Sequence, residues 1–89
     1  MPDLIWTGGI SETHKIAILA STYQVPFAPH DATGPVNIFA CAQICISSIN
    51  AMIQEHVPSY YEGWYGDFVD PNLDIKDGFL HAPQNPGIA

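Results

Sequence analysis

The sequence has 89 residues, of which 47% are hydrophobic and only 12% charged, with two lysines against nine acidic residues. A formal charge of −7 argues against binding to nucleic acid or to an anionic membrane surface, because both need clustered Lys or Arg. No apolar run reaches the roughly 18 residues that a membrane-spanning helix needs, and no secretory signal is visible at the N-terminus.

The small size and the sparse charge indicate that other structure covers much of this chain. A chain this short buries only about 60% of the surface of its unfolded state. We therefore expect a fragment of a larger protein. Cys41 and Cys45 lie four residues apart in a predicted helix, where both would serve as small apolar groups on one face. This use of cysteine fits a reducing compartment, so we expect a cytoplasmic protein.

The first elements alternate between extended and helical patterns. Residues 3–6 form a short apolar run closed by two glycines, which predicts the end of a buried strand and a tight turn. A helix is expected to begin near Ile10, with Glu12 in its first turn. The apolar face of this helix is predicted to consist of Ile16, Leu19, Ala20 and Tyr23. Residues 25–30 carry two prolines and predict an extended strand or a sheet edge.

The same alternation continues to residue 55. Residues 31–35 are expected to form a loop, and Gly34-Pro35 opens a second helix that runs to about Ser48. This helix is apolar nearly all round, which predicts burial on more than one side. Residues 51–55 are a third short strand candidate. The order strand, helix, strand, helix, strand predicts βαβ units and a parallel sheet.

The spacing of polar residues at the predicted strand ends indicates a barrel. Asp3 and His30 are 27 residues apart, and His30 and Glu55 are 25 apart. A (β/α)8 barrel of about 250 residues has units of about 31 residues, so each interval fits one unit. Three strands cannot close a barrel, so we expect the other strands to lie outside this sequence.

Asp3, His30 and Glu55 are the candidate catalytic residues. All three end predicted strands, which in a barrel places them on the rim that carries catalysis. An imidazole is a general base near neutral pH, and a neighbouring carboxylate can orient it and stabilise its protonated form. A second carboxyl group, kept protonated, can donate a hydrogen bond to a developing oxyanion. Singly, each residue is also explained as a cap, a turn former or a surface group.

The remaining polar and aromatic residues carry weaker signals. His14, His56 and His81 are expected to be solvated or to make local hydrogen bonds, and their spacing does not fit a zinc site. No nucleophile elbow or phosphate-binding glycine loop is present. The aromatic stretch 60–68 is expected to serve mainly in packing. Residues 74–80 predict a turn leading into a short strand, and residues 82–89 predict irregular surface chain.

Several motifs together resemble a known family. They occur in the same order over nearly the whole chain: Met1-Pro2-Asp3-Leu4, Gly8-Gly9-Ile10-Ser11-Glu12, Ala28-Pro29-His30-Asp31-Ala32-Thr33-Gly34-Pro35-Val36, Ile53-Gln54-Glu55 and Pro86-Gly87-Ile88. The sequence resembles the C-terminal part of the enolase superfamily, mandelate racemase subgroup. Within this subgroup it is most similar to sugar-acid dehydratases of the galactonate dehydratase type.

The resemblance implies an α/β fold that is the C-terminal portion of a (β/α)7β TIM-like barrel, incomplete as a separate chain. Residues 1–57 would supply the last three strands and two helices of this barrel. Residues 58–89 would form an aromatic and Pro/Gly-rich tail that returns toward an N-terminal capping domain absent from this sequence.

The resemblance also implies a chemistry for the candidate residues. Asp3 and His30 would form a dyad in which His30 removes the proton alpha to the substrate carboxylate, and Glu55 would hydrogen-bond the enediolate. The family binds Mg2+ through acidic residues on earlier strands, so no metal ligand is expected here. The implied parent is a hydro-lyase that converts an aldonic acid to a 2-keto-3-deoxy acid.

Two alternatives stay open from the sequence. One is a racemase or epimerase of a 2-hydroxy acid in the same superfamily, and the other is a catalytically inactive remnant. For the dehydratase hypothesis, the expected partner is a small-molecule sugar acid, with a homo-oligomer allowed for the full-length parent. The 89-residue chain alone is expected to be inactive.

Overall fold

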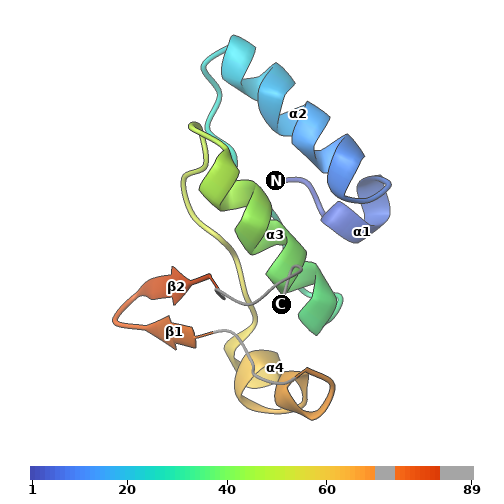
Figure 1. Cartoon of the computed structure of the whole chain (residues 1–89), viewed down its shortest axis with the longest axis vertical. Helices are drawn as coiled ribbons and strands as arrows, with labels where there is room; N and C mark the ends of the chain where they lie inside the picture. Colours follow the sequence, from blue (N-terminus) through green and yellow to red (C-terminus); the bar gives the residue numbers. More distant parts are fainter. Residues whose placement is uncertain (70–73, 83–89) are drawn as a thin grey trace.

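The computed structural model describes residues 1–69 and 74–82. Helix α3 runs through the middle of the molecule, with α1 and α2 on one side and α4 and a small hairpin on the other (Figure 1). The elements in chain order are α1 (Leu4–Thr7), α2 (Ile10–Thr22), α3 (Pro35–Ser47), α4 (Pro58–Glu62), the 3-10 helix η1 (Tyr65–Asp67), β1 (Asp74–Lys76) and β2 (Phe79–His81). The result is an α/β arrangement of helices with one small sheet.

Residues 4–7 form the short helix α1, so the prediction of a strand over this run was wrong. The side chain of Asp3 caps the helix, because its Oδ1 accepts hydrogen bonds from the backbone N–H groups of Ile5 (2.9 Å) and Trp6 (3.2 Å). Gly8 ends the helix with φ 113°, a conformation that glycine adopts without steric cost. Capping by Asp3 thus favours a helical turn over the strand that the apolar residues alone indicate.

Helix α2 begins at the expected residue but buries a different face. Its buried residues are Thr13 and Ala17, while Leu19 is 61% and Tyr23 is 74% exposed in this chain. The hydroxyl of Thr13 lies 3.0 Å from that of Thr7, which joins α2 to α1. Thr13 and Ala17 have small side chains, which let α2 approach its neighbours closely. The face of α2 that carries these two residues is therefore the one that packs.

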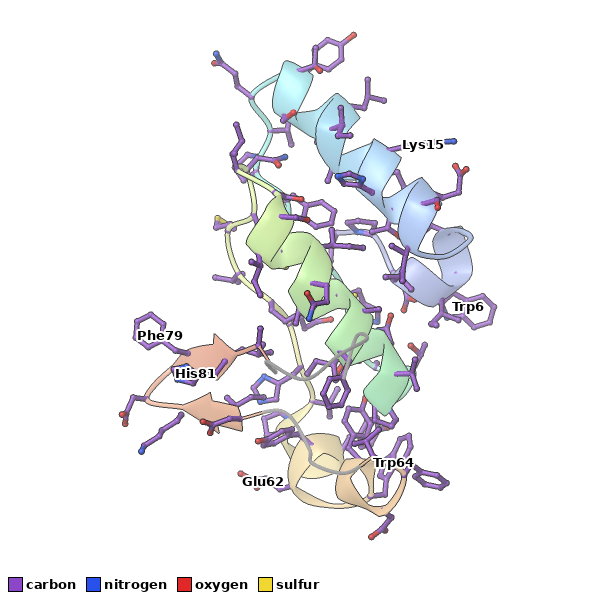
Figure 2. All side chains as sticks on the ribbon, in the orientation of Figure 1. Trp6, Lys15, Glu62, Trp64, Phe79 and His81 are labelled. Atoms are coloured by element: carbon purple, nitrogen blue, oxygen red, sulfur yellow. The ribbon has the colours of Figure 1, made fainter. Side chains whose placement is uncertain are left out.

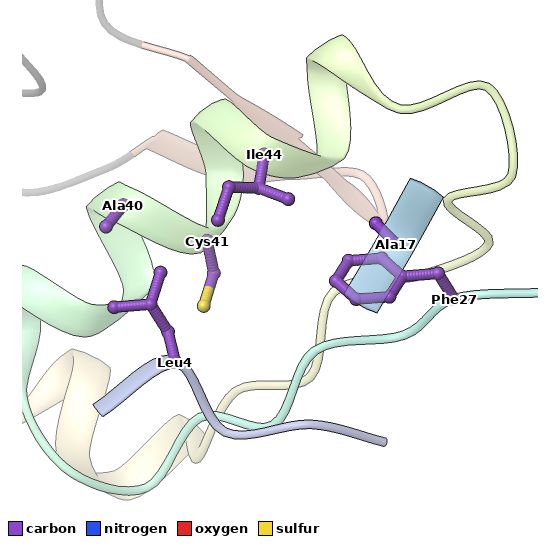
Figure 3. Packing of buried hydrophobic residues seen from close by; sticks show 6 residues of the cluster. All are labelled: Leu4, Ala17, Phe27, Ala40, Cys41 and Ile44. Carbon is purple, nitrogen blue, oxygen red and sulfur yellow. The ribbon is translucent and has the colours of Figure 1, made fainter. Parts of the chain in front are cut away.

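Helix α3 confirms the predicted helix and its burial on more than one side. Pro35 occupies its first turn, as Pro at this position requires no N–H donor. One side packs in a first core cluster with residues from α1, α2 and the extended segments, namely Leu4, Ala17, Phe27, Ala40, Cys41 and Ile44 (Figure 3). Another side packs in a second cluster that consists of Ile38, Phe39, Ala42 and Tyr65.

Three extended segments lie side by side and parallel. The N–H of Phe27 donates to Asn50 O and the N–H of Met52 donates to Phe27 O, both at 2.8 Å. The N–H of His30 donates to Pro2 O at 2.8 Å, next to a parallel bridge between Asp3 and His30. These pairings are isolated bridges rather than the continuous strands that were predicted. Pro26 and Pro29 in the middle segment lack an N–H group and cannot donate to a ladder.

The sheet consists of the antiparallel hairpin β1–β2, in which Asp74 pairs with His81 and Lys76 with Phe79. Asp77 and Gly78 make the turn with φ 55° and 80°, the positive values that two-residue hairpin turns favour. The chain therefore forms strands on both sides of a turn where one strand was expected. Ile75 and Leu80 pack against the second core cluster.

Two further expectations concern the C-terminal residues and membrane-spanning helices. Residues 83–89, expected to be irregular, lie outside the described residues. Within residues 1–69 and 74–82, no helix is long and apolar enough to cross a membrane.

The second core cluster allows a direct test of packing. Ile38 has no exposed surface, so Ile38→Ala should lower the free energy of unfolding of the intact protein by about 2 to 5 kcal/mol. The matched control Ile38→Val removes one methylene and should cost about 0.5 to 1.5 kcal/mol. Urea unfolding monitored by fluorescence measures both, and equal, small losses would contradict burial of Ile38.

Candidate active site

The three parallel segments bring Asp3, His30 and Glu55 to the same place. Asp3 and His30 are bridge partners, and the N–H of Glu55 reaches Pro29 O at 3.4 Å. His30 thus lies on the middle segment with one acidic residue on each neighbouring segment. This order is the one that strand-end residues of consecutive parallel strands adopt.

The imidazole of His30 faces one carboxyl group with each ring nitrogen. Its Nε2 lies 3.9 Å from Asp3 Oδ2, and its Nδ1 contacts Glu55 Oε2. The side chains of His30 and Glu55 are 38% and 34% exposed, whereas that of Asp3 is 10% exposed. A ligand can therefore reach the imidazole and Glu55, while Asp3 lies on the buried side of the ring.

The two oxygens of Asp3 have different environments. Oδ1 is engaged in capping α1, and Oδ2 is buried without a hydrogen-bond partner among the described residues. A buried carboxylate oxygen is costly unless a positive charge or a donor compensates it. The imidazole of His30 lies beside this oxygen, with its Nε2 3.9 Å away.

A second layer of polar residues lies behind this trio. Asp31 is fully buried, and its N–H donates to Glu55 Oε2 at 3.1 Å. Its carboxylate accepts hydrogen bonds from Asn37 Nδ2 (3.1 Å) and from the hydroxyl of Tyr65 (3.3 Å).

Sequence reasoning did not single out these three residues for function. The polar Asn37 in the first turn of a mostly apolar helix is the signal that could have indicated a buried network.

Burial dominates the electrostatics of this layer. It raises the pKa of Asp31 above its ordinary value, against the opposing effect of the Asn37 and Tyr65 hydrogen bonds. Burial, and then the Asp31 carboxylate, raise the pKa of Tyr65 to about 12. The pKa values of the free thiols are also raised by burial, to about 12 for Cys41 and about 11 for Cys45. These thiols are therefore protonated and unreactive near neutral pH, as expected for core cysteines.

The other histidines lie away from the trio or make local contacts. His14 is exposed on α2. His81 lies on β2 (Figure 2). His56 makes an edge contact with the ring of Tyr61 at a centroid distance of 5.9 Å. Within the described ranges, no group of three His, Cys, Asp or Glu side chains is arranged to hold a metal ion. The part of the chain that the structure describes therefore offers no ligand set for Mg2+.

The aromatic stretch both packs and lines a cavity. Tyr65 is fully buried, with its ring 4.7 Å from that of Trp64 in an edge-to-face arrangement. Trp64 and Phe68 line an apolar cavity of about 300 Å3 together with Ile5 and residues 33–37. This cavity does not include the catalytic candidates.

Comparison with known proteins gives a consistent family. A family model described as enolase C-terminal domain-like matches residues 1–89. A D-xylonate dehydratase from Haloferax volcanii is 38% identical over 87 residues, which cover 98% of this chain and 21% of that protein. A D-galactonate dehydratase from Variovorax paradoxus is 38% identical over 92 residues, with 98% and 24% covered.

A solved structure supports the same relationship. The crystal structure of an enolase of the mandelate racemase subgroup from Agrobacterium tumefaciens matches with a TM-score of 0.82 and 35% identity. The match covers 93% of this chain and 25% of that one. The chain thus spans between a fifth and a quarter of the length of the relatives named here.

The raised pKa of Tyr65 predicts a loss of stability at alkaline pH. The pKa is about 12 in the folded protein against 10 for an ordinary tyrosine. The unfolded state therefore loses this proton first, and the contribution of Tyr65 is complete below pH 10 and lost as pH rises to 12. Between these pH values, the free energy of unfolding should fall by about 2 to 3 kcal/mol more in the intact protein than in its Tyr65→Phe variant.

Urea unfolding at intervals between pH 9 and pH 12 measures this difference. The other tyrosines and the two cysteines are common to both proteins, so their titration cancels in the comparison. Parallel pH profiles for the two proteins would contradict the burial of the Tyr65 hydroxyl against Asp31.

Proposed function

This chain belongs to the enolase C-terminal domain-like family, and we propose that it supplies the proton-abstracting side of the active site of a Mg2+-dependent sugar-acid dehydratase. The observation that carries the proposal is an accessible imidazole, His30, that faces a carboxyl group with each ring nitrogen. Relatives named D-xylonate dehydratase and D-galactonate dehydratase, each 38% identical, point to an aldonic acid as substrate.

In this proposal His30 is the general base. Its Nδ1, the ring nitrogen that does not face Asp3, takes the proton from the carbon alpha to the substrate carboxylate, and the electrons of that C–H bond move into the carboxylate to give an enediolate. The 3-hydroxyl then leaves as water, with a proton from a general acid outside this chain. The resulting enol becomes a ketone, so the products are one 2-keto-3-deoxy acid and one water.

Asp3 and Glu55 have different parts in this step. The buried Oδ2 of Asp3 lies beside His30 and stabilises the imidazolium that proton transfer creates. The carboxyl group of Glu55 is about as exposed as the imidazole, so it can contact a ligand bound at His30. We assign it to the substrate carboxylate, where a hydrogen bond strengthens as negative charge develops.

Residues 1–89 contribute to this step without binding the metal in the proposal. The described residues offer no ligand set for Mg2+, and we assign its binding to parts of the parent that this chain does not span. For this reason we expect no turnover from residues 1–89 alone. The steps attributed here to His30, Asp3 and Glu55 are proton transfer, orientation and hydrogen bonding only.

The domain organisation is part of the same proposal. Residues 1–57 would form the last three strands and two helices of a TIM-like barrel, which the parallel pairing of the three segments supports. Residues 58–89 would run toward a capping domain. The described part of this stretch begins with α4 and packs through Tyr65 on α3.

Replacement of His30 in the intact protein tests the proposed function. His30→Asn should lower the rate of solvent exchange of the alpha proton by roughly 10²- to 10⁴-fold, the usual contribution of a general base. NMR of D-xylonate and D-galactonate incubated with enzyme in D2O measures the exchange. The matched control His14→Asn changes an exposed histidine on α2 and should leave the rate unchanged.

The products of the wild-type reaction distinguish a dehydratase from a racemase or epimerase. A 2-keto-3-deoxy acid, trapped with semicarbazide, supports a dehydratase. Exchange with inversion at the alpha carbon, without formation of a ketone, would contradict the dehydratase hypothesis and support a racemase or epimerase. Undiminished exchange in His30→Asn would remove His30 from the role of base.

A further inference from the structure

We propose that Asp31, Asn37 and Tyr65 form a buried positioning network that fixes His30 and Glu55 from behind. Through Tyr65, the chain that follows the last predicted strand would thereby set the geometry of proton abstraction. This inference deepens the proposed function and rests on it. None of the three residues is a candidate for contact with substrate, because all three are at most 1% exposed.

The network holds both accessible residues of the trio. Asn37 Nδ2 donates to the backbone oxygen of His30 at 3.2 Å and to Asp31 Oδ1 at 3.1 Å. The N–H of Asp31 donates to Glu55 Oε2 at 3.1 Å, the same oxygen that contacts His30 Nδ1. A shift of Asp31 would therefore move the backbone next to His30 and release the carboxyl group of Glu55.

Tyr65 anchors this network from a distant part of the sequence. Its hydroxyl lies 3.3 Å from both carboxylate oxygens of Asp31, 34 residues away. Its ring is fixed on α3 by Ile38, Phe39 and Ala42. Because the ring is fixed, its hydroxyl group stays in one place, between the two carboxylate oxygens of Asp31. The hydroxyl therefore determines the orientation of that carboxylate.

Burial makes the Tyr65 hydrogen bond important for that orientation. A buried carboxylate that loses one donor carries a desolvation cost that water cannot relieve without entering the core. We therefore expect Asp31 to turn or shift when the hydroxyl is removed. Displacements of about 1 Å at a reacting group can lower a rate about 100-fold.

The test compares two tyrosines in the intact protein. Tyr65→Phe removes only the hydroxyl that reaches Asp31, while Tyr60→Phe removes the hydroxyl of a neighbouring, 39% exposed ring. Tyr65→Phe should lower kcat for the sugar acid by about 10- to 100-fold with KM changed less than threefold. Tyr60→Phe should leave both constants unchanged. A loss confined to KM, or equal losses in both variants, would overturn the proposal.

A readout without turnover separates this inference from the proposed function. With histidine labelled at 13Cε1, the His30 signal should shift in Tyr65→Phe and stay in place in Tyr60→Phe, with the signal of exposed His14 as internal reference. If the protein acts on no sugar acid but the His30 signal shifts, the function fails and the network stands. An unchanged His30 signal in Tyr65→Phe would overturn the network.

Discussion

Backbone pairing between three parallel segments is the constraint on which the site depends. The bonds from His30 N to Pro2 O and between Phe27 and residues 50–52 fix the order of the segments. His30 is then necessarily between Asp3 and Glu55, and its two nitrogens face two carboxyl groups. The side chains add the chemistry, but the position of each one follows from main-chain hydrogen bonds.

Helix α3 holds this arrangement together because it packs on two sides. Its first cluster closes over Phe27 and Leu4, which keeps the extended segments in place. Its second cluster receives Tyr65 and the hairpin. Asn37, in the first turn of the same helix, connects this packing to the backbone of His30. A nearly all-apolar helix with one buried amide thus serves both stability and site geometry.

The sequence predicts the two long helices because glycine and proline act locally. It predicts the proximity of Asp3, His30 and Glu55 because their spacing fits one strand–helix unit of a barrel each. Residues 4–7 form a helix rather than the predicted strand because Asp3 caps it. Helix α2 buries Thr13 and Ala17 rather than the predicted apolar face. These outcomes depend on side-chain contacts that periodicity does not encode. The link from Tyr65 to Asp31 could not be predicted either, since it joins residues 34 positions apart through tertiary packing.

A crystal structure of the intact protein with a bound aldonic acid tests the central claim most directly. We predict that the alpha carbon of the ligand faces the imidazole of His30, with Asp3 on the buried side of the ring and the ligand carboxylate near Glu55. A ligand bound with its alpha carbon away from His30, or an imidazole separated from both carboxyl groups, would contradict the account.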